Sequence, residues 1–334
     1  MKKCCPEDLP LISVIIVNWN GAKFLAKCLA ALKAQTFKSF EIIIIDNGSN
    51  DRSVDNLETT WPEVRVERLK KNKGFAAANN LGARLAKGTW LALINYDAFP
   101  TPGWLQALSD ASIKFSEFSF FASYLVMAER NNYTDGMGDI YNVCGMAWRR
   151  GHGKPMDIFK QKEIEVFGPC AAAAFYPREL FLKAGGFDED YFCYHEDVDM
   201  AFRLRLQGHR CLFVPDAVVK HVGSGSHGSE SDFVRYFSHR NLVWTYVKNM
   251  PGVLVWWYLP AHLLFNLISI FWFLGRGQGN TICRAKKDAM LGLRKVIHKR
   301  RQIQQTRKIH FTQIKTIMDR HWINPYLKPH YRTE

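Results

Sequence analysis

Apolar and polar residues follow one another in blocks along the first hundred positions of the chain. Several apolar blocks are unbroken runs rich in β-branched residues, which is typical of strands covered on both faces of a sheet. The blocks between them have the pattern of amphipathic helices. Strands are expected at 11–17, 41–45, 64–69 and 90–94, and helices at 22–34, 53–60 and 75–86. This order predicts an α/β fold whose mostly parallel, doubly wound sheet is flanked by helices.

The pattern is less regular beyond residue 115. Glycine-rich stretches near 135–139 and 149–153 predict a loop region, and the apolar run 166–176 predicts a buried strand. Helices are expected at 177–184 and 196–207, and strands at 211–214 and 218–220.

Polar side chains follow three of the expected strands at the point where each strand ends. Open α/β sheets bind their ligands beyond the carboxyl ends of the strands. Each polar group alone could be only a turn or a helix cap, but three at one edge favour a ligand site. The residues are Asn18, Trp19 and Asn20 after the first strand, Asp46 and Asn47 after the second, and Asn95, Tyr96 and Asp97 after the fourth.

Some of these residues suggest a specific chemistry. Asp97, two positions after Asn95, could hold a hard divalent cation and through it a diphosphate, because such ions take one or two carboxylates plus phosphate oxygens. The alternative is that Asp97 caps a helix at 100–113. Asp46 could accept a hydrogen bond from the imide N–H of uracil or thymine. The start of the helix at 75–86 could lie along the nucleotide and sugar, through Lys73, Gly74 and Asn79.

Residues 187–199 carry six carboxylates in thirteen positions, interleaved with aromatic residues. Carboxylates this dense repel one another unless a cation, a hydroxyl or solvent holds them. Asp197, beside Glu196 at the start of a helix, is the candidate general base for an acceptor hydroxyl. Asp199 pairs with Arg203 one helical turn on and is expected on the helix surface. The segment 188–190 is expected to be a turn and cap.

His221 follows a predicted strand and precedes a Gly-Ser-Gly-Ser stretch. A lone histidine is usually a surface or core residue, but at this position it could complete the shell of a metal ion.

The basic charge of the chain is concentrated at its C-terminal end. Residues 276–334 hold 15 Lys and Arg against 3 Asp and Glu, so this segment carries +12 of the formal net charge of +14. Just before it, the 22 residues 253–274 contain no charged side chain, a length that could span a bilayer. Pro260, His262 and the basic flanks favour instead a helix or re-entrant hairpin lying in the cytoplasmic leaflet, with the tail on anionic headgroups. A spanning helix, soluble core helices and a homo-oligomer interface are the alternatives.

Composition narrows the class of protein further. A hydrophobic content of 47% without low-complexity segments indicates a folded enzyme-sized chain. The eight cysteines show no CxxC spacing, which favours reduced thiols. No secretory signal opens the chain, so secretion is not expected. The basic tail adjoins an aromatic, apolar segment, which favours lipid over nucleic acid as its partner.

Seven short motifs, in order over residues 11–250, resemble those of family 2 glycosyltransferases. Any one of them is weak, but seven in register are specific for the family, and they look closest to the rhamnosyltransferase-like bacterial enzymes of surface-polysaccharide synthesis. The motifs are Val-Asn-Trp-Asn-Gly (17–21), Asp-Asn-Gly-Ser-Asn-Asp (46–51), Asn-Lys-Gly-Phe-Ala-Ala-Ala-Asn-Asn (72–80), Asn-Tyr-Asp-Ala (95–98), Gly-Gly-Phe-Asp-Glu-Asp (185–190), His-Glu-Asp-Val-Asp (195–199) and His-Val-Gly-Ser (221–224).

The resemblance implies a GT-A fold, Rossmann-like in its sheet, and transfer of a sugar such as L-rhamnose from a UDP- or dTDP-sugar with inversion. It implies Mg²⁺ or Mn²⁺ as cofactor and a lipid-linked glycan or polysaccharide as acceptor, in synthesis of the cell envelope. Asp46 would contact the pyrimidine base, Asp97 and His221 would bind the metal, and Asp197 would be the base. Asn95 stands where the family's motif has its first acidic residue, so metal binding rests more heavily on Asp97.

Two other functions compete with a hexosyltransferase. A nucleotidyltransferase that makes nucleotide sugars would carry a Gly- and Arg/Lys-rich loop after the first strand, and residues 18–23 offer little of that. A non-catalytic membrane-binding relative would be expected to lack Asp97 or Asp197, and both are present. We therefore expect a catalytic domain at 1–230, with a nucleotide-sugar half (11–100) and an acceptor half (101–230). A basic helical module at 231–334 would associate with the cytoplasmic face of the membrane.

Overall fold

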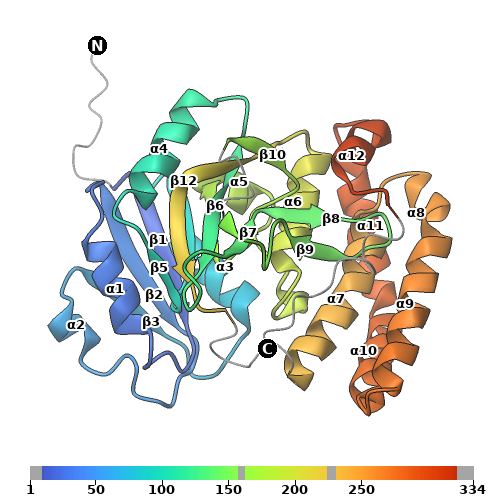
Figure 1. Ribbon diagram of the computed structural model, residues 1–334, viewed down its shortest axis with the longest axis horizontal. Helices are drawn as coiled ribbons and strands as arrows, with labels where there is room; N and C mark the ends of the chain where they lie inside the picture. The colour runs from blue at the N-terminus through green and yellow to red at the C-terminus, as the bar shows by residue number, and fades with distance from the viewer. Residues whose placement is uncertain (1–9, 157–161, 224–230, 322–334) are drawn as a thin grey trace.

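A ten-stranded mixed sheet with helices on both faces forms the centre of the molecule (Figure 1). The computed structural model describes residues 10–156, 162–223 and 231–321. The strand order is β10-β12-β6-β11-β4-β1-β2-β3, with β5 paired to β12 and β7 to β6. The predicted α/β class is confirmed.

The first half of the sheet is parallel, as predicted. Its strands β1, β2 and β4 are largely buried, with all seven residues buried in β1, whereas the edge strand β3 is mostly exposed or half-buried. The pairing places Asn18 opposite Asp46 and Val17 opposite Asn95, so the three polar strand ends meet at one edge. The elements are β1 (Ile12–Asn18), α1 (Leu25–Lys33), β2 (Phe40–Asp46), α2 (Leu57–Thr60), β3 (Val64–Arg68), α3 (Phe75–Leu85) and β4 (Trp90–Asn95).

The second half mixes strand directions. β12 pairs in parallel with β6, whereas β11 runs antiparallel to both β4 and β6. The elements are β5 (Ala98–Pro100), α4 (Trp104–Lys114), β6 (Phe120–Met127), β7 (Thr134–Met137), β8 (Asp139–Tyr141), β9 (Ala147–Arg149), β10 (Ile164–Val166), β11 (Ala173–Pro177), α5 (Arg178–Lys183), the 3₁₀ turn η2 (Glu189–Tyr191), α6 (Glu196–Leu206) and β12 (Cys211–His221).

Two strand predictions in this half were wrong in extent. The run 166–176 is not one strand: β10 pairs with β12, and β11 pairs with β4 and β6. The strand expected at 211–214 continues as β12 to His221, through a register shift between Val214 and Val218. This continuation brings His221 opposite Ala98, directly after Asp97.

The C-terminal helices pack beside the sheet and share its core. Tyr246, Met250, Leu254 and Ile314 belong to the same buried cluster as sheet residues such as Ile15. These helices lie together at one side of the sheet (Figure 1). They are α7 (Asp232–Asn249), α8 (Leu254–Trp257), α9 (Leu259–Leu274), α10 (Gly279–Leu291), α11 (Leu293–Gln305) and α12 (Phe311–Ile317).

The uncharged segment 253–274 is not one continuous helix. It breaks at Tyr258 between α8 and α9, and Pro260 lies in the first turn of α9, where a proline is tolerated. Within the described residues, no helix combines the length and the apolar character needed to cross a membrane.

Candidate active site

A cavity of about 410 Å³ opens at the carboxyl edge of the sheet, where β4 and β12 end and α6 begins. It gathers residues far apart in the sequence, from the ends of β1, β4 and β12, from β8 and β9, and from the starts of α3, α6 and α7. The polar and aromatic residues that line it include Trp19, Asn47, Asn95, Tyr96, Asp97, Asp139, Trp148, Arg149, Glu196, Asp197 and His221.

Asp97, His221 and Asp135 form a buried chain at this cavity. Nδ1 of His221 lies 2.7 Å from Oδ2 of Asp135, and Nε2 lies 3.5 Å from Oδ1 of Asp97. All three side chains are nearly inaccessible to solvent. Asp97 does not cap the next helix, because α4 begins only at Trp104 with Gly103 at its N-cap.

The pKa values of Asp135 and His221 are determined by the charged side chains that contact them. Burial alone would raise the pKa of Asp135, but Arg149, His152 and His221 hold that pKa well below its usual range. Burial alone would lower the pKa of His221, but the carboxylate of Asp135 at hydrogen-bond distance and that of Asp97 at 3.5 Å outweigh burial and raise the pKa to about 9. Since the Asp135 carboxylate can only accept, Nδ1 of His221 carries a proton and Nε2 faces Asp97.

This arrangement fits a divalent cation. Nε2 of His221 is buried and has no good hydrogen-bond partner among the described residues, while a carboxylate oxygen lies beside it. The Asp135–His221 contact resembles the carboxylate–histidine pairs that orient metal-binding imidazoles. Within residues 10–156, 162–223 and 231–321, no group of three potential ligands is assembled. Asp97 and His221 would therefore share the ion with oxygens from elsewhere, such as phosphate.

Asp197 occupies the first turn of α6 and lines the same cavity. Its Oδ2 accepts a hydrogen bond of 2.9 Å from the backbone N–H of Ala171, and its Oδ1 accepts one of 2.8 Å from that of Val198. Burial raises the pKa of Asp197 even though these N–H groups stabilise the anion. Its neighbour Glu196 is almost fully buried, and burial together with Asp197 raises the pKa of Glu196 well above the usual value. Glu196 therefore stays protonated to a higher pH, which leaves Asp197 as the carboxylate available to accept a proton.

Arg149, Asp135 and Asp139 are site residues that sequence reasoning missed. The small β8–β9 ladder places Asp139 opposite Arg149, and the Arg149 guanidinium forms an ion pair with Asp135. Arg149 and Asp139 line the cavity, and Arg149 brings a positive charge to a site rich in carboxylates. The glycine-rich stretches at 135–139 and 149–153 were the available signal.

The residues predicted to bind the donor fall into two groups. Trp19, Asn47, Asn95 and Tyr96 line the cavity, and Oδ1 of Asn95 is buried without a hydrogen-bond partner in the described part of the chain. The others do not line it: Asn18, Asp46 and Asn79 are buried, Gly74 is buried beneath Phe192, and Asn20 and Lys73 are exposed.

The buried members of the second group support the cavity wall. Asn18 donates to Asp46 (3.1 Å), to Ser49 and to Ser53, which fixes the ends of β1 and β2 against each other. Asn79 donates to the carbonyl of Phe75 within α3. The structure therefore gives Asn18 and Asn79 supporting contacts rather than contacts in the cavity. The contact of Asp46 with the pyrimidine base of the donor stays a prediction.

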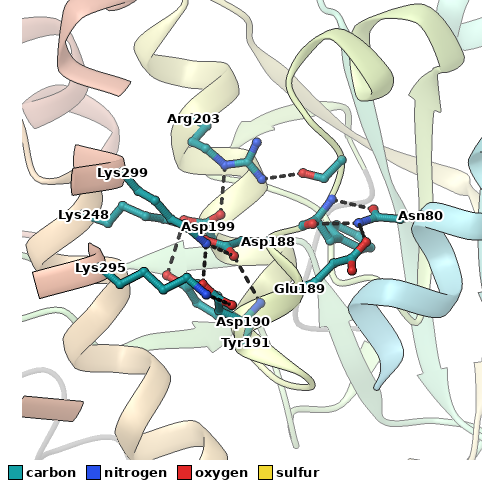
Figure 2. Close-up of polar contacts among 12 residues, drawn as sticks. Asn80, Asp188, Glu189, Asp190, Tyr191, Asp199, Arg203, Lys248, Lys295 and Lys299 are labelled. Carbon is teal, nitrogen blue, oxygen red and sulfur yellow. Dashed lines mark hydrogen bonds and ion pairs between the residues drawn. The ribbon is translucent and has the colours of Figure 1, made fainter. Parts of the chain in front are cut away.

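Of the other four carboxylates in the acidic run, Asp188, Asp190 and Asp199 are held by cations, and Glu189 accepts a hydrogen bond from Asn80. Asp199 is paired with Arg203 as predicted, at 2.9 Å, but it was wrongly expected on the helix surface. Asp199 is fully buried, and Lys248 of α7 also contacts it at 2.7 Å. Asp188 caps the 3₁₀ turn η2, as expected for an architectural residue (Figure 2).

The six cysteines in the described parts of the chain are free thiols.

This sheet, with a carboxylate pair and a histidine at its carboxyl edge, is that of a GT-A glycosyltransferase. The model of glycosyl transferase family 2 matches residues 13–184, and the chain belongs to that family. It is therefore a hexosyltransferase-type enzyme, as predicted.

Among known proteins, the chain is similar to the N-acetylglucosaminyl-diphospho-decaprenol L-rhamnosyltransferase of Mycobacterium tuberculosis. The two are 25% identical over 276 residues, which covers 75% of this chain and 87% of the relative. The predicted resemblance to rhamnosyltransferase-like enzymes is thereby confirmed.

Two solved structures share the fold at low sequence identity. GalNAc-T7, solved with UDP, GalNAc and Mn²⁺, matches with a TM-score of 0.59 at 20% identity over 77% of this chain and 50% of that one. The mannosyltransferase PcManGT from Pyrobaculum calidifontis, solved with GDP-Man and Mn²⁺, matches with a TM-score of 0.53 at 17% identity over 93% and 87% of the two chains.

Proposed function

We propose that this enzyme is an inverting, metal-dependent glycosyltransferase of cell-envelope glycan synthesis. It moves a sugar, with L-rhamnose the first candidate, from a UDP- or dTDP-sugar to a lipid-linked or polysaccharide acceptor. The observation that carries the proposal is the placement of Asp197 in the same cavity as the Asp97–His221 pair. A proton acceptor and a cation site around one cavity are the two groups that displacement of a nucleoside diphosphate requires.

Asp97 and His221 would hold the cation, which is Mg²⁺ or Mn²⁺. When bound, the ion would neutralise charge on the diphosphate leaving group. The two structures of the same fold that were solved with Mn²⁺ support this assignment. Arg149, on the cavity wall, would add a second positive charge near the phosphates.

Asp197 would act as the general base. The acceptor hydroxyl gives its proton to Asp197 while its oxygen forms a bond to the anomeric carbon. The bond from that carbon to the diphosphate oxygen breaks, and the nucleoside diphosphate leaves from the opposite face, so the configuration inverts. The raised pKa of Asp197 brings this carboxylate closer to working pH, where general bases are most effective.

The identity of the substrates is proposed from the relatives. The similar Mycobacterium tuberculosis enzyme is named for transfer of L-rhamnose to N-acetylglucosaminyl-diphospho-decaprenol. This supports a dTDP-L-rhamnose-type donor and a polyprenyl-diphosphate glycan as acceptor here.

An apolar surface on α8 and α9 supports work at a membrane. We define the apolar face as Val253, Trp256, Trp257, Leu263, Leu264, Leu267, Phe271 and Trp272, all of which are exposed. The neighbouring Arg276, Arg284 and Lys287 are exposed cations. Aromatic residues suit the bilayer interface and the cations suit anionic headgroups, so the module would lie in the cytoplasmic leaflet beside its lipid-linked acceptor.

The test is a transfer assay with purified full-length protein. UDP- and dTDP-sugars, including dTDP-L-rhamnose, are offered with a short-chain polyprenyl-diphosphate-GlcNAc acceptor, with Mn²⁺, with Mg²⁺ and with a chelator. We expect a metal-dependent glycoside whose anomeric configuration, by NMR, is opposite to that of the donor. Absence of transfer with every donor, retention of configuration or activity unaffected by the chelator would contradict the proposal.

A further inference from the structure

The backbone that leads into Asp197 takes an unfavourable conformation. Phe192, Tyr194 and His195 have φ angles of 65°, 66° and 68°, in the left-handed region that side chains other than glycine rarely adopt. We call residues 191–195 the base loop, because α6 with Asp197 follows it directly. Three strained residues in one short segment persist only where the surroundings hold them.

One side chain from the C-terminal helices holds the base loop. Nδ2 of Asn241, in α7, lies 3.0 Å, 2.9 Å and 2.7 Å from the carbonyl oxygens of Tyr191, Cys193 and Tyr194. Asn241 is fully buried, and the neighbouring Arg240 donates to the Tyr191 carbonyl as well. The curve of the base loop is thus fixed by a residue of the C-terminal helices.

Lysines from α7 and α11 hold the acidic residues on both sides of this loop (Figure 2). Lys248 contacts Asp188 at 2.6 Å and Asp199 at 2.7 Å; Asp199 is fully buried, and 10% of the Asp188 side chain is exposed. Lys299 contacts Asp188 at 2.5 Å and Asp190 at 2.6 Å. Burial alone would raise the pKa of Asp188, but Lys248 and Lys299 lower it. The charge density of the acidic run is therefore balanced by cations of the C-terminal helices.

The opposite side of the base loop touches the first half of the catalytic domain. The carbonyl of Phe192 accepts a hydrogen bond of 3.2 Å from the N–H of Ala76, in the first turn of α3. A Cβ added at Gly74 would come within 2.6 Å of Phe192. The ring of Phe192 stacks on Phe237 of α7 at 5.1 Å. The base loop is thus packed between α3 and α7.

We infer that Asn241, Lys248 and Lys299 are positioning residues for the general base, and that α7 and α11 are part of the active site rather than an appended module. Movement of the base loop would displace Asp197 relative to the acceptor hydroxyl. This inference rests on the proposed function only for the role of Asp197; the contacts themselves stand independently of the reaction.

Asn241→Asp tests the inference with little change of shape. The new carboxylate repels the three carbonyls that the amide bound, and the exposed Asn280→Asp of α10 is the matched control. We expect faster hydrogen exchange in peptides covering 188–199 and a kcat lower by about 10²-fold, the effect of a displacement near 1 Å. Affinity for UDP and KM for the donor should stay unchanged, a split that general destabilisation would not produce.

Lys299→Gln tests the charge contacts at a less buried position. It removes one cation from Asp188 and Asp190, and Arg301→Gln removes an exposed cation from the same helix as its control. We expect faster exchange at 188–191 and a lower kcat for Lys299→Gln alone. If Asn241→Asp does not fold, Lys299→Gln still tests whether the C-terminal helices position the base loop.

Unchanged exchange at the base loop in the variants, or faster exchange with an unchanged kcat, would overturn the inference. Failure of the proposed function is distinguishable, because the unmodified enzyme would then show no transfer with any donor while the exchange comparison still reports whether Asn241 holds the loop.

Discussion

Asp197 combines burial, which favours its neutral form, with two backbone N–H groups, which favour its anion. This balance suits a group that must take a proton and release it in each turnover. The neighbouring Glu196 has no hydrogen-bond partner for Oε2 among the described residues and remains protonated to a higher pH. Two adjacent carboxylates thus differ in protonation because their environments differ.

Asp197→Asn should therefore abolish base catalysis. We expect kcat to fall by about 10²- to 10⁴-fold, the usual contribution of a general base. Calorimetry should show unchanged affinity for UDP, because Asp197 is not part of the expected donor site. Glu179→Gln, an exposed carboxylate on α5, is the control and should keep full activity. Full transfer activity in Asp197→Asn would refute the base assignment.

Asp135 is expected to act on the cation through His221. Asp135→Asn weakens the contact that orients the imidazole and removes the carboxylate that pairs with Arg149. Such supporting carboxylates typically change metal affinity by about 10- to 100-fold. The Mn²⁺ concentration for half-maximal activity should rise by this factor, while kcat at saturating Mn²⁺ stays close to that of the unmodified enzyme. An unchanged Mn²⁺ requirement would show that His221 does not hold the ion.

The sequence revealed some of these residues and not others for a physical reason. Asp97 and Asp197 lie in local motifs, at a strand end and a helix start, so their positions followed from neighbouring residues. Asp135 and Arg149 enter the site only because the β8–β9 ladder closes and Asp135 reaches β12. Such contacts depend on tertiary pairing, which local spacing does not encode.

At the scale of elements, continuous apolar runs predicted β1, β2 and β4 well, because a strand buried on both faces leaves a clear pattern. The strands β10 and β11 were merged because the residues between them, 167–172, are also apolar and largely buried. The single strand β12 was predicted as two, because Pro215 and Asp216 interrupt the apolar pattern at the register shift without ending the strand.

The packing of α7, α9 and α10 encloses a lysine, Lys286, that forms no ion pair with a carboxylate of the described residues. Nζ of Lys286 lies 2.5 Å from Oδ1 of Asn266 and 3.0 Å from the carbonyl of His239. Burial lowers the pKa of Lys286 from 10.5 to about 7. The histidines near it, His195, His239 and His262, also have pKa values lowered by burial and titrate below this range.

The stability of this helix packing should rise with pH above 7. Between pH 7 and 10.5 Lys286 is neutral in the folded state and charged in the unfolded state, so the unfolded state binds more protons. Lys286→Met removes this pH-dependent contribution to the free energy of unfolding. Urea unfolding at several pH values should show the free energy of unfolding of the unmodified protein gaining on the variant as pH rises. The exposed Lys287→Met is the control, and a pH-independent difference for Lys286→Met would contradict the lowered pKa.

At the scale of the whole molecule, the basic charge of the last 59 residues has two uses. Lys295 and Lys299 of α11 point to the acidic run beside the catalytic site, while Arg276, Arg284 and Lys287 stay exposed near the apolar face. Composition predicted a basic C-terminal module but not this division, because the partners of the inward lysines are acidic residues about a hundred positions earlier in the chain.

The apolar face should bind membranes that contain anionic lipid. Burial of one large apolar side chain contributes about 1.5–3 kcal/mol, so Phe271→Ser combined with Trp272→Ser should weaken vesicle binding by about 100-fold or more. Vesicle flotation measures this, and Ile113→Ser, an exposed apolar residue on α4, should bind as the unmodified protein does. Binding should also weaken as salt is raised, since it depends partly on headgroup charge.

Two results would exclude membrane binding through the apolar face. Unchanged flotation of the double variant would show that the apolar face is not the membrane contact. Sedimentation of both proteins without vesicles tests the alternative. A homo-oligomer formed by the unmodified protein and lost in the double variant would show that a second copy covers this face. If the membrane contact holds, the lipid surface lies against α8 and α9, and α7 connects this module to the base loop through Asn241. The acceptor lipid and the base that activates its glycan would then be arranged by one continuous set of helices.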